Sequence, residues 1–319
     1  MTWQSVLFEG LGTLGQSLSL GHNHLLGQTI GRAIWYLVPQ RRQLAINAIM
    51  HHLDLNSTQA RRLAYLNFKH IGCSFSEILL NKKVDLRFAR EHFLNQDPEL
   101  FSSMADQKRS IVAVTGHLGA WELLAGILRL NFSERTSQII MQKGKNRDWN
   151  QFIVHYRQHP GVDILHNKKS SRQIMRCLKN NGISSFLVDH NCGRRKALFL
   201  PFLKEYAAVN MGPAFLAVKA EALLWPIFLL RQKNHKYQII SFKPLDTQTL
   251  SGNKEEKIVQ ATSFYTRAVE SMVKAYPEQW FWMHKRWKKQ PKSDTDLRHA
   301  RLAEQFNAAK HTKNPGSGA

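Results

Sequence analysis

Cysteine, acidic residues and long apolar runs are all scarce in this chain of 319 residues. Its three cysteines, Cys73, Cys177 and Cys192, do not have the paired spacing of a metal site or a disulfide framework. This usage fits a reduced cytoplasmic compartment, and we expect Cys192 to pack rather than react. The sequence also contains no Gly-x-Ser-x-Gly elbow and no His-Glu-x-x-His motif. We therefore expect no acyl-enzyme, no cofactor and no metal site.

The shortage of acidic residues leaves a strong positive charge. The chain has 45 Lys and Arg against 23 Asp and Glu, a formal net charge of +22. Such an excess predicts an anionic partner: a phospholipid headgroup, a phosphorylated glycolipid, an acidic acyl carrier protein or nucleic acid. The 43% of hydrophobic residues are enough for a substantial core.

No stretch reaches the ~20 predominantly apolar residues that a spanning helix needs. The longest uncharged run, 10–31, is rich in glycine and interrupted by Gln, His and Asn. It also lacks the basic start and cleavage site of a secretory signal. Leu11, Leu14, Leu18 and Leu25 share one helical face, which favours an interfacial helix lying on a bilayer. The alternative is a core-packing helix weakened by its glycines.

Apolar runs and helical patterns alternate along most of the chain. We expect strands at 110–115, 137–141, 162–166, 183–189, 223–230 and 236–241, and helices at 118–130, 147–158, 168–180, 211–221 and 254–275. Residues 24–80 look helical, with breaks near Val38-Pro39 and 55–57. The alternation predicts an α/β fold with a largely parallel central sheet flanked by helices and an N-terminal helical segment.

We divide the chain into three parts on this pattern. Residues 1–38 form an N-terminal helical segment with possible membrane-surface contact. Residues 39–300 form a single α/β domain. Residues 301–319 form a polar tail whose end we expect to be disordered.

The stretch 111–122, Ile-Val-Ala-Val-Thr-Gly-His-Leu-Gly-Ala-Trp-Glu, carries the most chemistry. A buried-strand pattern ends just before His117, and Glu122 follows as a helical pattern begins. An α/β sheet places reactive groups outside the carboxyl ends of its strands. His followed five residues later by an acid also occurs at His92 and His299, but only His117 has this context. The pattern is typical of a general base oriented by a carboxylate; a structural His at a strand end is the alternative.

A second acid, Asp189, ends another buried-strand pattern, 183–188, just before a loop containing glycine. We expect Asp189 and His117 to face one cleft. The alternative for Asp189 is a turn residue that caps its own loop. Tryptophans at 280, 282 and 287 are interleaved with a basic run, which suits either a lipid headgroup layer or a packed core with exposed cations.

Five segments in order resemble the lipid A biosynthesis acyltransferases, a lauroyl and myristoyl transferase family within the His-x4-Asp/Glu glycerolipid acyltransferases. They are GHLGAWE at 116–122, VDHNCG at 188–193, LPFL at 200–203, GPAFLA at 212–217 and PEQWFWMHKRWK at 277–288. The resemblance covers roughly residues 20–290. Lys204, Val209 and His190 depart from that family's usual residues, as does the segment 142–147. These departures leave the reaction type standing and affect the substrate.

The resemblance implies an acyltransferase that moves a fatty acyl chain from an acyl thioester to a hydroxyl of a lipid A precursor-like membrane lipid. In this hypothesis Glu122 holds His117 in the productive tautomer, and His117 takes the proton of the acceptor hydroxyl. Backbone N–H groups at the start of the 118–130 helix would stabilise the oxyanion. Asp189, Asn146, Arg157 and Gly193 are implied as substrate-binding residues.

The implied partners are acyl carrier protein or acyl-coenzyme A as donor, an anionic membrane lipid as acceptor, and the membrane surface itself. The implied location is the cytoplasmic face of the bacterial inner membrane, peripheral or monotopic. Alternatives are acylation of a lysophospholipid or an amino-acid lipid, and a catalytically silent basic protein that binds lipid or nucleic acid. No nucleic-acid-binding motif is recognisable, so we expect no such partner.

Overall fold

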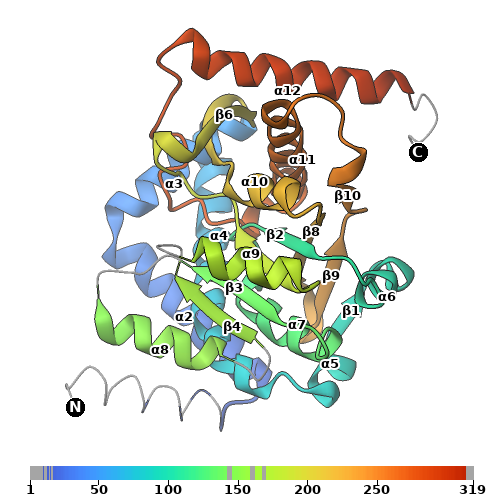
Figure 1. The fold of residues 1–319 in the computed structure, drawn as a ribbon. Helices are drawn as coiled ribbons and strands as arrows, with labels where there is room; N and C mark the ends of the chain where they lie inside the picture. The colour runs from blue at the N-terminus through green and yellow to red at the C-terminus, as the bar shows by residue number, and fades with distance from the viewer. Residues whose placement is uncertain are drawn as a thin grey trace.

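The computed structural model describes residues 10, 13, 15, 17–141, 146–158, 162–166 and 170–313. Its centre is an eight-stranded sheet in the order β1-β9-β8-β2-β5-β3-β4, with β10 also paired to β8 (Figure 1). The strands of this sheet are β1 (Phe93–Asn95), β2 (Ile111–Thr115), β3 (Ser137–Met141), β4 (Val162–His166), β5 (Ile183–Leu187), β8 (Leu223–Arg231), β9 (Tyr237–Ser241) and β10 (Leu245–Asp246). β6 (Ala197–Phe202) and β7 (Glu205–Asn210) form a separate antiparallel hairpin.

The sheet is parallel except at β8, which pairs antiparallel with β9 and β10. Every residue of β2 and β8 is buried, as expected for strands covered on both faces. Alternate residues of β2 divide between two cores, so Val112 and Val114 face one side, and Ile111 and Ala113 face the other.

Helices cover both faces. α9 (Ser171–Lys179), α10 (Gly212–Lys219) and α11 (Lys254–Ala275) pack on the face of Val112, whereas α6 (Pro98–Ala105) and α7 (Leu124–Asn131) pack on the face of Ile111. α8 (Arg147–Arg157) packs beside the short helix η1 (Ile78–Lys83), and α5 (Leu86–His92) precedes β1. α12 (Asp294–Lys313) lies across one end of the molecule against α11 and β6 (Figure 1).

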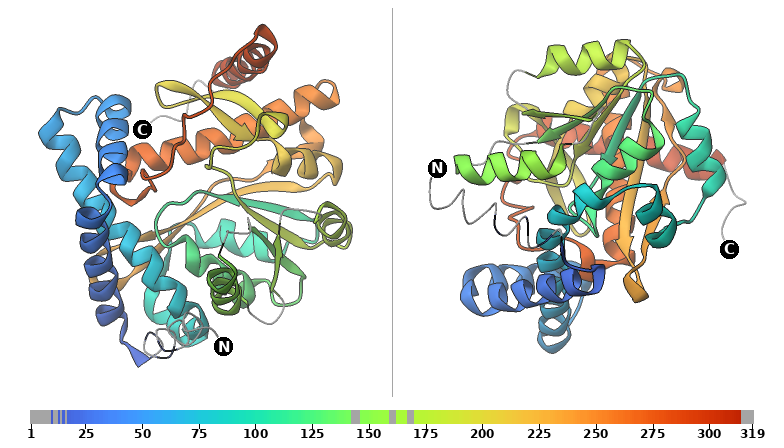
Figure 2. Two further views of the ribbon diagram at one scale, coloured as in Figure 1. Left: turned by 90° about the vertical axis from the view of Figure 1, so that its left-hand side faces the viewer. Right: turned by 90° about the horizontal axis from the view of Figure 1, so that it is seen from below.

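The N-terminal helices α2 (Leu20–Leu37), α3 (Pro39–Leu53) and α4 (Ser57–Glu77) gather at one side of the sheet (Figure 2). α2 packs closely along α4 because glycines line the crossing. A Cβ added at Gly31 would lie 2.2 Å from the carbonyl oxygen of Phe68, and one at Gly72 would lie 2.0 Å from that of Gly27. These glycines permit α2 and α4 to pack closely, so the contact between the two helices depends on them. α4 begins with a capping box between Asn56 and Gln59.

The predicted α/β fold is confirmed, and so are the six predicted strands, each within two residues of its observed ends. The predictions missed short elements that carry weak periodicity: β1, the β6–β7 hairpin, β10, α5 and α6. The boundary that we placed after residue 300 falls inside α12. Residues Leu11 and Leu14 of the expected interfacial face lie outside the described residues. Among the helices of the described residues, none is long and apolar enough to cross a membrane.

Candidate active site

Two neighbouring parallel strands, β2 and β5, bring His117 and Asp189 together. Thr115 at the end of β2 pairs in register with Leu187 at the end of β5, and each site residue lies two positions further along its strand's direction. The imidazole Nδ1 of His117 lies 2.7 Å from Oδ1 of Asp189. The backbone N–H of His117 also donates to Oδ2 of Asp189 at 2.7 Å. The two strand ends therefore bring these residues together as expected, but among the described residues only His117 of the pair lines the cavity, because the Asp189 side chain is buried.

Asp189 is buried beneath His117, at 2% exposure, and both of its carboxylate oxygens have hydrogen-bond partners. In addition to both contacts with His117, its Oδ2 accepts a hydrogen bond from Nε1 of Trp280 at 2.8 Å. Burial alone would raise the pKa of Asp189, but the interactions with His117, His284 and Trp280 lower it far below its usual range. The buried Asp189 carboxylate therefore contacts His117 directly, and it does not line the cavity in the described part of the chain.

The Asp189 contact sets the tautomer of His117. A proton on Nδ1 donates to the carboxylate, which leaves the Nε2 lone pair for the cavity. The ring is 29% exposed at its side chain and is one of the residues that line that cavity. Burial lowers the pKa of His117, but the Asp189 carboxylate, its hydrogen bond and the nearby Glu122 raise it above the ordinary value overall. The arrangement matches a general base whose protonated form is stabilised by a buried carboxylate.

The loop that carries His117 is held by backbone contacts on both sides. Gly119 has a φ of +65°, and a Cβ there would lie 2.1 Å from the carbonyl oxygen of Leu229, so only glycine fits. The N–H of Gly119 donates to the carbonyl of Gln279 at 3.0 Å, and the N–H of Ala120 donates to that of Leu229 at 2.7 Å. The N–H of Leu118 donates back to Gly116 at 2.8 Å. These three N–H groups donate to carbonyls of the protein, so they are not free to bind an oxyanion.

Glu122 does not orient His117 as expected. It lies in a short helical turn, η2 (Trp121–Leu123), and its carboxylate forms a two-pronged ion pair with Arg157. The distances are 2.6 Å from Nε to Oε2 and 2.5 Å from Nη2 to Oε1. Nε1 of Trp121 donates to the same carboxylate at 3.0 Å. A bidentate pair of this kind fixes the guanidinium plane, so Glu122 acts on Arg157 and the oriented imidazole depends on Asp189.

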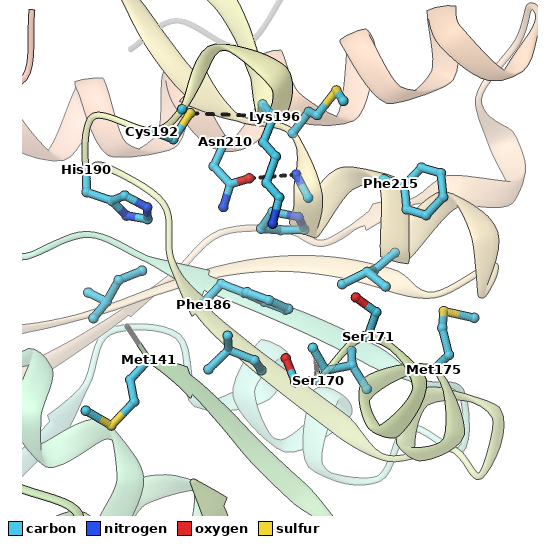
Figure 3. A pocket seen from close by; sticks show the side chains of 18 of the residues that line it. Met141, Ser170, Ser171, Met175, Phe186, His190, Cys192, Lys196, Asn210 and Phe215 are labelled. Carbon is cyan, nitrogen blue, oxygen red and sulfur yellow. Dashed lines mark hydrogen bonds between the residues drawn. The ribbon is translucent and has the colours of Figure 1, made fainter. Parts of the chain in front are cut away.

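A large cavity of about 1340 Å³ opens at His117. Figure 3 shows Lys196 and Asn210 on one wall, and Phe186 and Ser170 on the wall facing them. Its basic lining residues are Arg157, Arg172, Arg176, Lys179, Lys196, Lys219 and Lys289. No Asp or Glu lines this cavity within the parts of the chain that the structure describes. The cavity is larger than a typical small-molecule site of ~300–1,000 Å³ and suits a bulky anionic ligand.

A smaller apolar cavity of about 60 Å³ adjoins the first. The two share Ile140, Met141, Phe186, Leu187 and Arg157 as lining residues. The rest of its lining is mainly aliphatic and comes from β2, β3 and α7, with Leu124, Ile127 and Leu128 among the residues. At about 60 Å³ this cavity is a small apolar recess beside the large one, and His117 is not among its described lining residues.

The other predicted site residues divide between cavity and surface. Arg157 and Gly193 line the large cavity. Asn146 does not line it within the described residues; it is exposed before α8, and its backbone carbonyl accepts from Asn150. Asn150, one helical turn later, is buried and does line the cavity.

Sequence reasoning missed the contribution of Trp280, which holds Asp189, and of His284, whose Nε2 lies 3.0 Å from the Asp189 backbone carbonyl. Both lie in the tryptophan-rich segment that we singled out for its composition. Trp280 and Trp282 are 0% and 1% exposed, so they belong to the core and not to a headgroup layer. Cys192 is buried as expected, and burial raises the pKa of its thiol.

Comparison with known proteins gives the reaction class of this site. The family described as bacterial lipid A biosynthesis acyltransferase matches residues 10–289. The chain belongs to this family. It is 24% identical over 290 residues to the lipid A biosynthesis lauroyltransferase of Escherichia coli (strain K12), an alignment that covers 88% of this chain and 91% of the relative.

A second relative, the lipid A biosynthesis palmitoleoyltransferase of the same organism, is 24% identical over 131 residues, which is 41% of each chain. These relatives differ in the acyl chain that their names specify. The resemblance drawn from the five segments is therefore confirmed, and the chain is an acyltransferase of this family.

Proposed function

We propose that this acyltransferase moves a fatty acyl group from an acyl thioester to a hydroxyl of a lipid A precursor, with His117 as general base. The observation that carries the proposal is the pair of His117 and Asp189, 2.7 Å apart, at the mouth of a basic cavity with an adjoining apolar one. The basic residues of the large cavity suit a phosphorylated acceptor, and its apolar residues, among them Ile174, Phe186 and Leu216, suit the acyl chain.

In the proposed reaction, Nε2 of His117 takes the proton of the acceptor hydroxyl as its oxygen attacks the thioester carbonyl. Asp189 stabilises the imidazolium that forms. The tetrahedral intermediate then breaks its C–S bond, and the imidazolium returns the proton to the leaving thiolate. An ester and a free thiol result, so neither a redox partner nor an acyl-enzyme is needed. General-base catalysis of this type contributes ~10²–10⁴-fold.

In this proposal, Arg157 stabilises the oxyanion of the tetrahedral intermediate in place of the occupied N–H groups of 118–120. Its Nε and Nη2 are held by Glu122, and among the described residues its Nη1 hydrogen-bonds only to the thioether sulfur of Met141, at 3.9 Å. An oriented cation on the cavity wall stabilises a developing oxyanion in a low-dielectric site. Glu122 would then serve catalysis through Arg157.

The proposed partners follow from the same features. The donor is acyl carrier protein or acyl-coenzyme A, and the acceptor is an anionic lipid at the cytoplasmic face of the inner membrane. Leu25, Tyr36 and Leu37 on α2 are 57%, 69% and 78% exposed, which is unusual for large apolar side chains. We propose that the side of α2 that carries these exposed residues contacts the membrane surface as a peripheral anchor.

The test compares the wild type with His117→Ala and with His155→Ala, an exposed histidine on α8 that does not line the described cavity. Each protein is incubated with membrane-lipid extracts, a lipid A precursor, and labelled acyl-acyl carrier protein or acyl-coenzyme A. Mass spectrometry then identifies new labelled lipids.

We expect a new ester that is formed by the wild type and His155→Ala and is lost with His117→Ala. Its mass identifies the acceptor and separates a lipid A precursor from a lysophospholipid or an amino-acid lipid. Equal product from His117→Ala, with unchanged circular dichroism, would remove His117 as the base. No product from any of the proteins, with both donors supplied, would overturn the proposed activity.

A further inference from the structure

We propose that His51, His52 and Glu205 bind a divalent transition metal, with zinc the best match. His51 and His52 are in the last turn of α3, and Glu205 is the first residue of β7. One potential ligand atom from each lies within 4.8 Å of the other two. Nε2 of His51 already lies 2.8 Å from Oε1 of Glu205. No residue spacing predicts this cluster, because Glu205 comes from a hairpin distant in the sequence.

His52 is held in place beside the cluster by packing. It is 6% exposed, and its ring stacks on Trp287 with centroids 3.5 Å apart and planes inclined by 19°. Its Nδ1 is buried, and none of the described residues hydrogen-bonds to it.

Glu205 is oriented by a neighbour in the way that metal-binding carboxylates are. Its second oxygen, Oε2, accepts a hydrogen bond from Nε2 of Gln290 at 3.2 Å, which leaves Oε1 toward the histidines. Lys204, which precedes Glu205 in the chain, forms an ion pair with Asp54.

The donor set selects the metal. Two imidazoles and one carboxylate suit zinc, whereas calcium and magnesium prefer oxygen ligands alone. Tetrahedral bonds of ~2.0–2.1 Å put neighbouring ligand atoms ~3.3 Å apart, so the more separated atoms must move slightly closer. The side chains of His51 and Glu205 are 58% and 39% exposed and are free to make that adjustment. Water would take the fourth position.

The location indicates a structural role. A bound ion would join the end of α3 to the start of β7, and β7 ends at Asn210 on the wall of the active-site cavity. None of the three ligands lines that cavity in the described part of the chain. The metal would therefore stabilise the hairpin that supports one wall, without contact with the reacting groups.

The test measures zinc binding by isothermal titration calorimetry on the full-length, tag-free protein after treatment with chelator. The variants are His51→Ala and Glu205→Gln, both at exposed side chains whose loss does not disturb the core. The matched control is His299→Ala, which breaks an ion pair of the same kind: Nε2 of His299 lies 2.9 Å from Oε1 of Glu255. Among the described residues, no second histidine completes a metal-binding cluster there. Thermal melting with and without zinc is the second readout.

We expect one zinc ion to bind the wild type and His299→Ala, with binding at least about tenfold weaker in His51→Ala and Glu205→Gln. Zinc should raise the melting temperature of the first two proteins and not of the last two. The proposal is wrong if the wild type binds no zinc, if His51→Ala binds it as tightly as the wild type, or if His299→Ala loses it equally.

Discussion

Replacement of Asp189 by Asn tests the assignment of the orienting carboxylate most directly, because the surrounding donors determine how the amide must lie. Oδ2 accepts two N–H groups, from the backbone of His117 at 2.7 Å and from Trp280 at 2.8 Å. The amide oxygen must remain at this position, since an NH₂ group there would face two donors. The NH₂ group then takes the place of Oδ1 and points at Nδ1 of His117.

This orientation reverses the tautomer of the base. The amide donates to Nδ1 of His117, so the imidazole proton moves to Nε2, where a lone pair is needed for catalysis. In the Ser-His-Asp triad, the equivalent change lowers kcat about 10⁴-fold with the geometry intact. We expect a loss of ~10³–10⁴-fold for Asp189→Asn, which corresponds to about 4–5.5 kcal/mol of transition-state stabilisation.

The assay is the initial rate of acyl transfer from a labelled thioester to the lipid A precursor at saturating substrate. Asp246→Asn is the matched control, since it removes an acid that is paired with Arg109 outside the active-site cavity. Thermal melting verifies that both variants are folded. A rate for Asp189→Asn within tenfold of the wild type would refute the reasoning, because the assigned tautomer would then have no kinetic consequence.

Three further predictions follow from the charges of the site. The kcat/KM of the wild type should rise with pH through a midpoint above 6.5, because Asp189 and Glu122 outweigh burial and favour the imidazolium of His117, which is inactive as a base; a midpoint below 6.5 would contradict this. Arg157→Gln leaves the carboxylate of Glu122, which is 5% exposed, without its ion pair, and should lower the free energy of unfolding by ~3–5 kcal/mol in chemical denaturation. The double variant Arg157→Gln/Glu122→Gln should recover part of that loss. Additive losses from the two substitutions would contradict coupling between them. The double variant Arg172→Ala/Arg176→Ala should raise the KM for a phosphorylated acceptor about tenfold or more with little change in kcat, since charge-assisted hydrogen bonds contribute ~1.5–3 kcal/mol each. As a control, alanine at Arg62 and Arg301, which are exposed outside the described cavity, should leave KM unchanged.

The fold was predictable where burial imposes a period on the sequence. β2 and β8 are buried on both faces and read as apolar runs, and the capped helices α4 and α11 have clear starts at Asn56 and Asn253. The β6–β7 hairpin was missed because burial does not alternate along either strand and its turn uses Leu203 with a φ of +56° in place of glycine. A leucine in that conformation gives no turn signal.

The site was predictable in its strand ends and not in its partners. That His117 and Asp189 each follow a buried strand is a local property of the sequence, and adjacent parallel strands bring such residues to one edge. Their hydrogen bond depends on strand order, because β2 and β5 are neighbours only after two intervening strands have been placed further out in the sheet. The anchoring of Asp189 by Trp280 depends on a segment still further along the chain.

The position of Glu122 shows why spacing alone misassigns a carboxylate. In a regular helix, residues five apart lie about 140° apart around the axis, so this spacing does not by itself bring the acid to the histidine. Here Gly119 takes a φ of +65°, and the helical geometry begins only at Trp121, so Glu122 is directed toward α8 and pairs with Arg157. Each carboxylate then has a separate partner, and the two charges do not compete for one imidazole. If this division holds, Asp189→Asn acts on the tautomer of His117 and Arg157→Gln acts on the oriented cation. Their effects on the pH dependence of the rate should then differ, with the first displacing the midpoint further than the second.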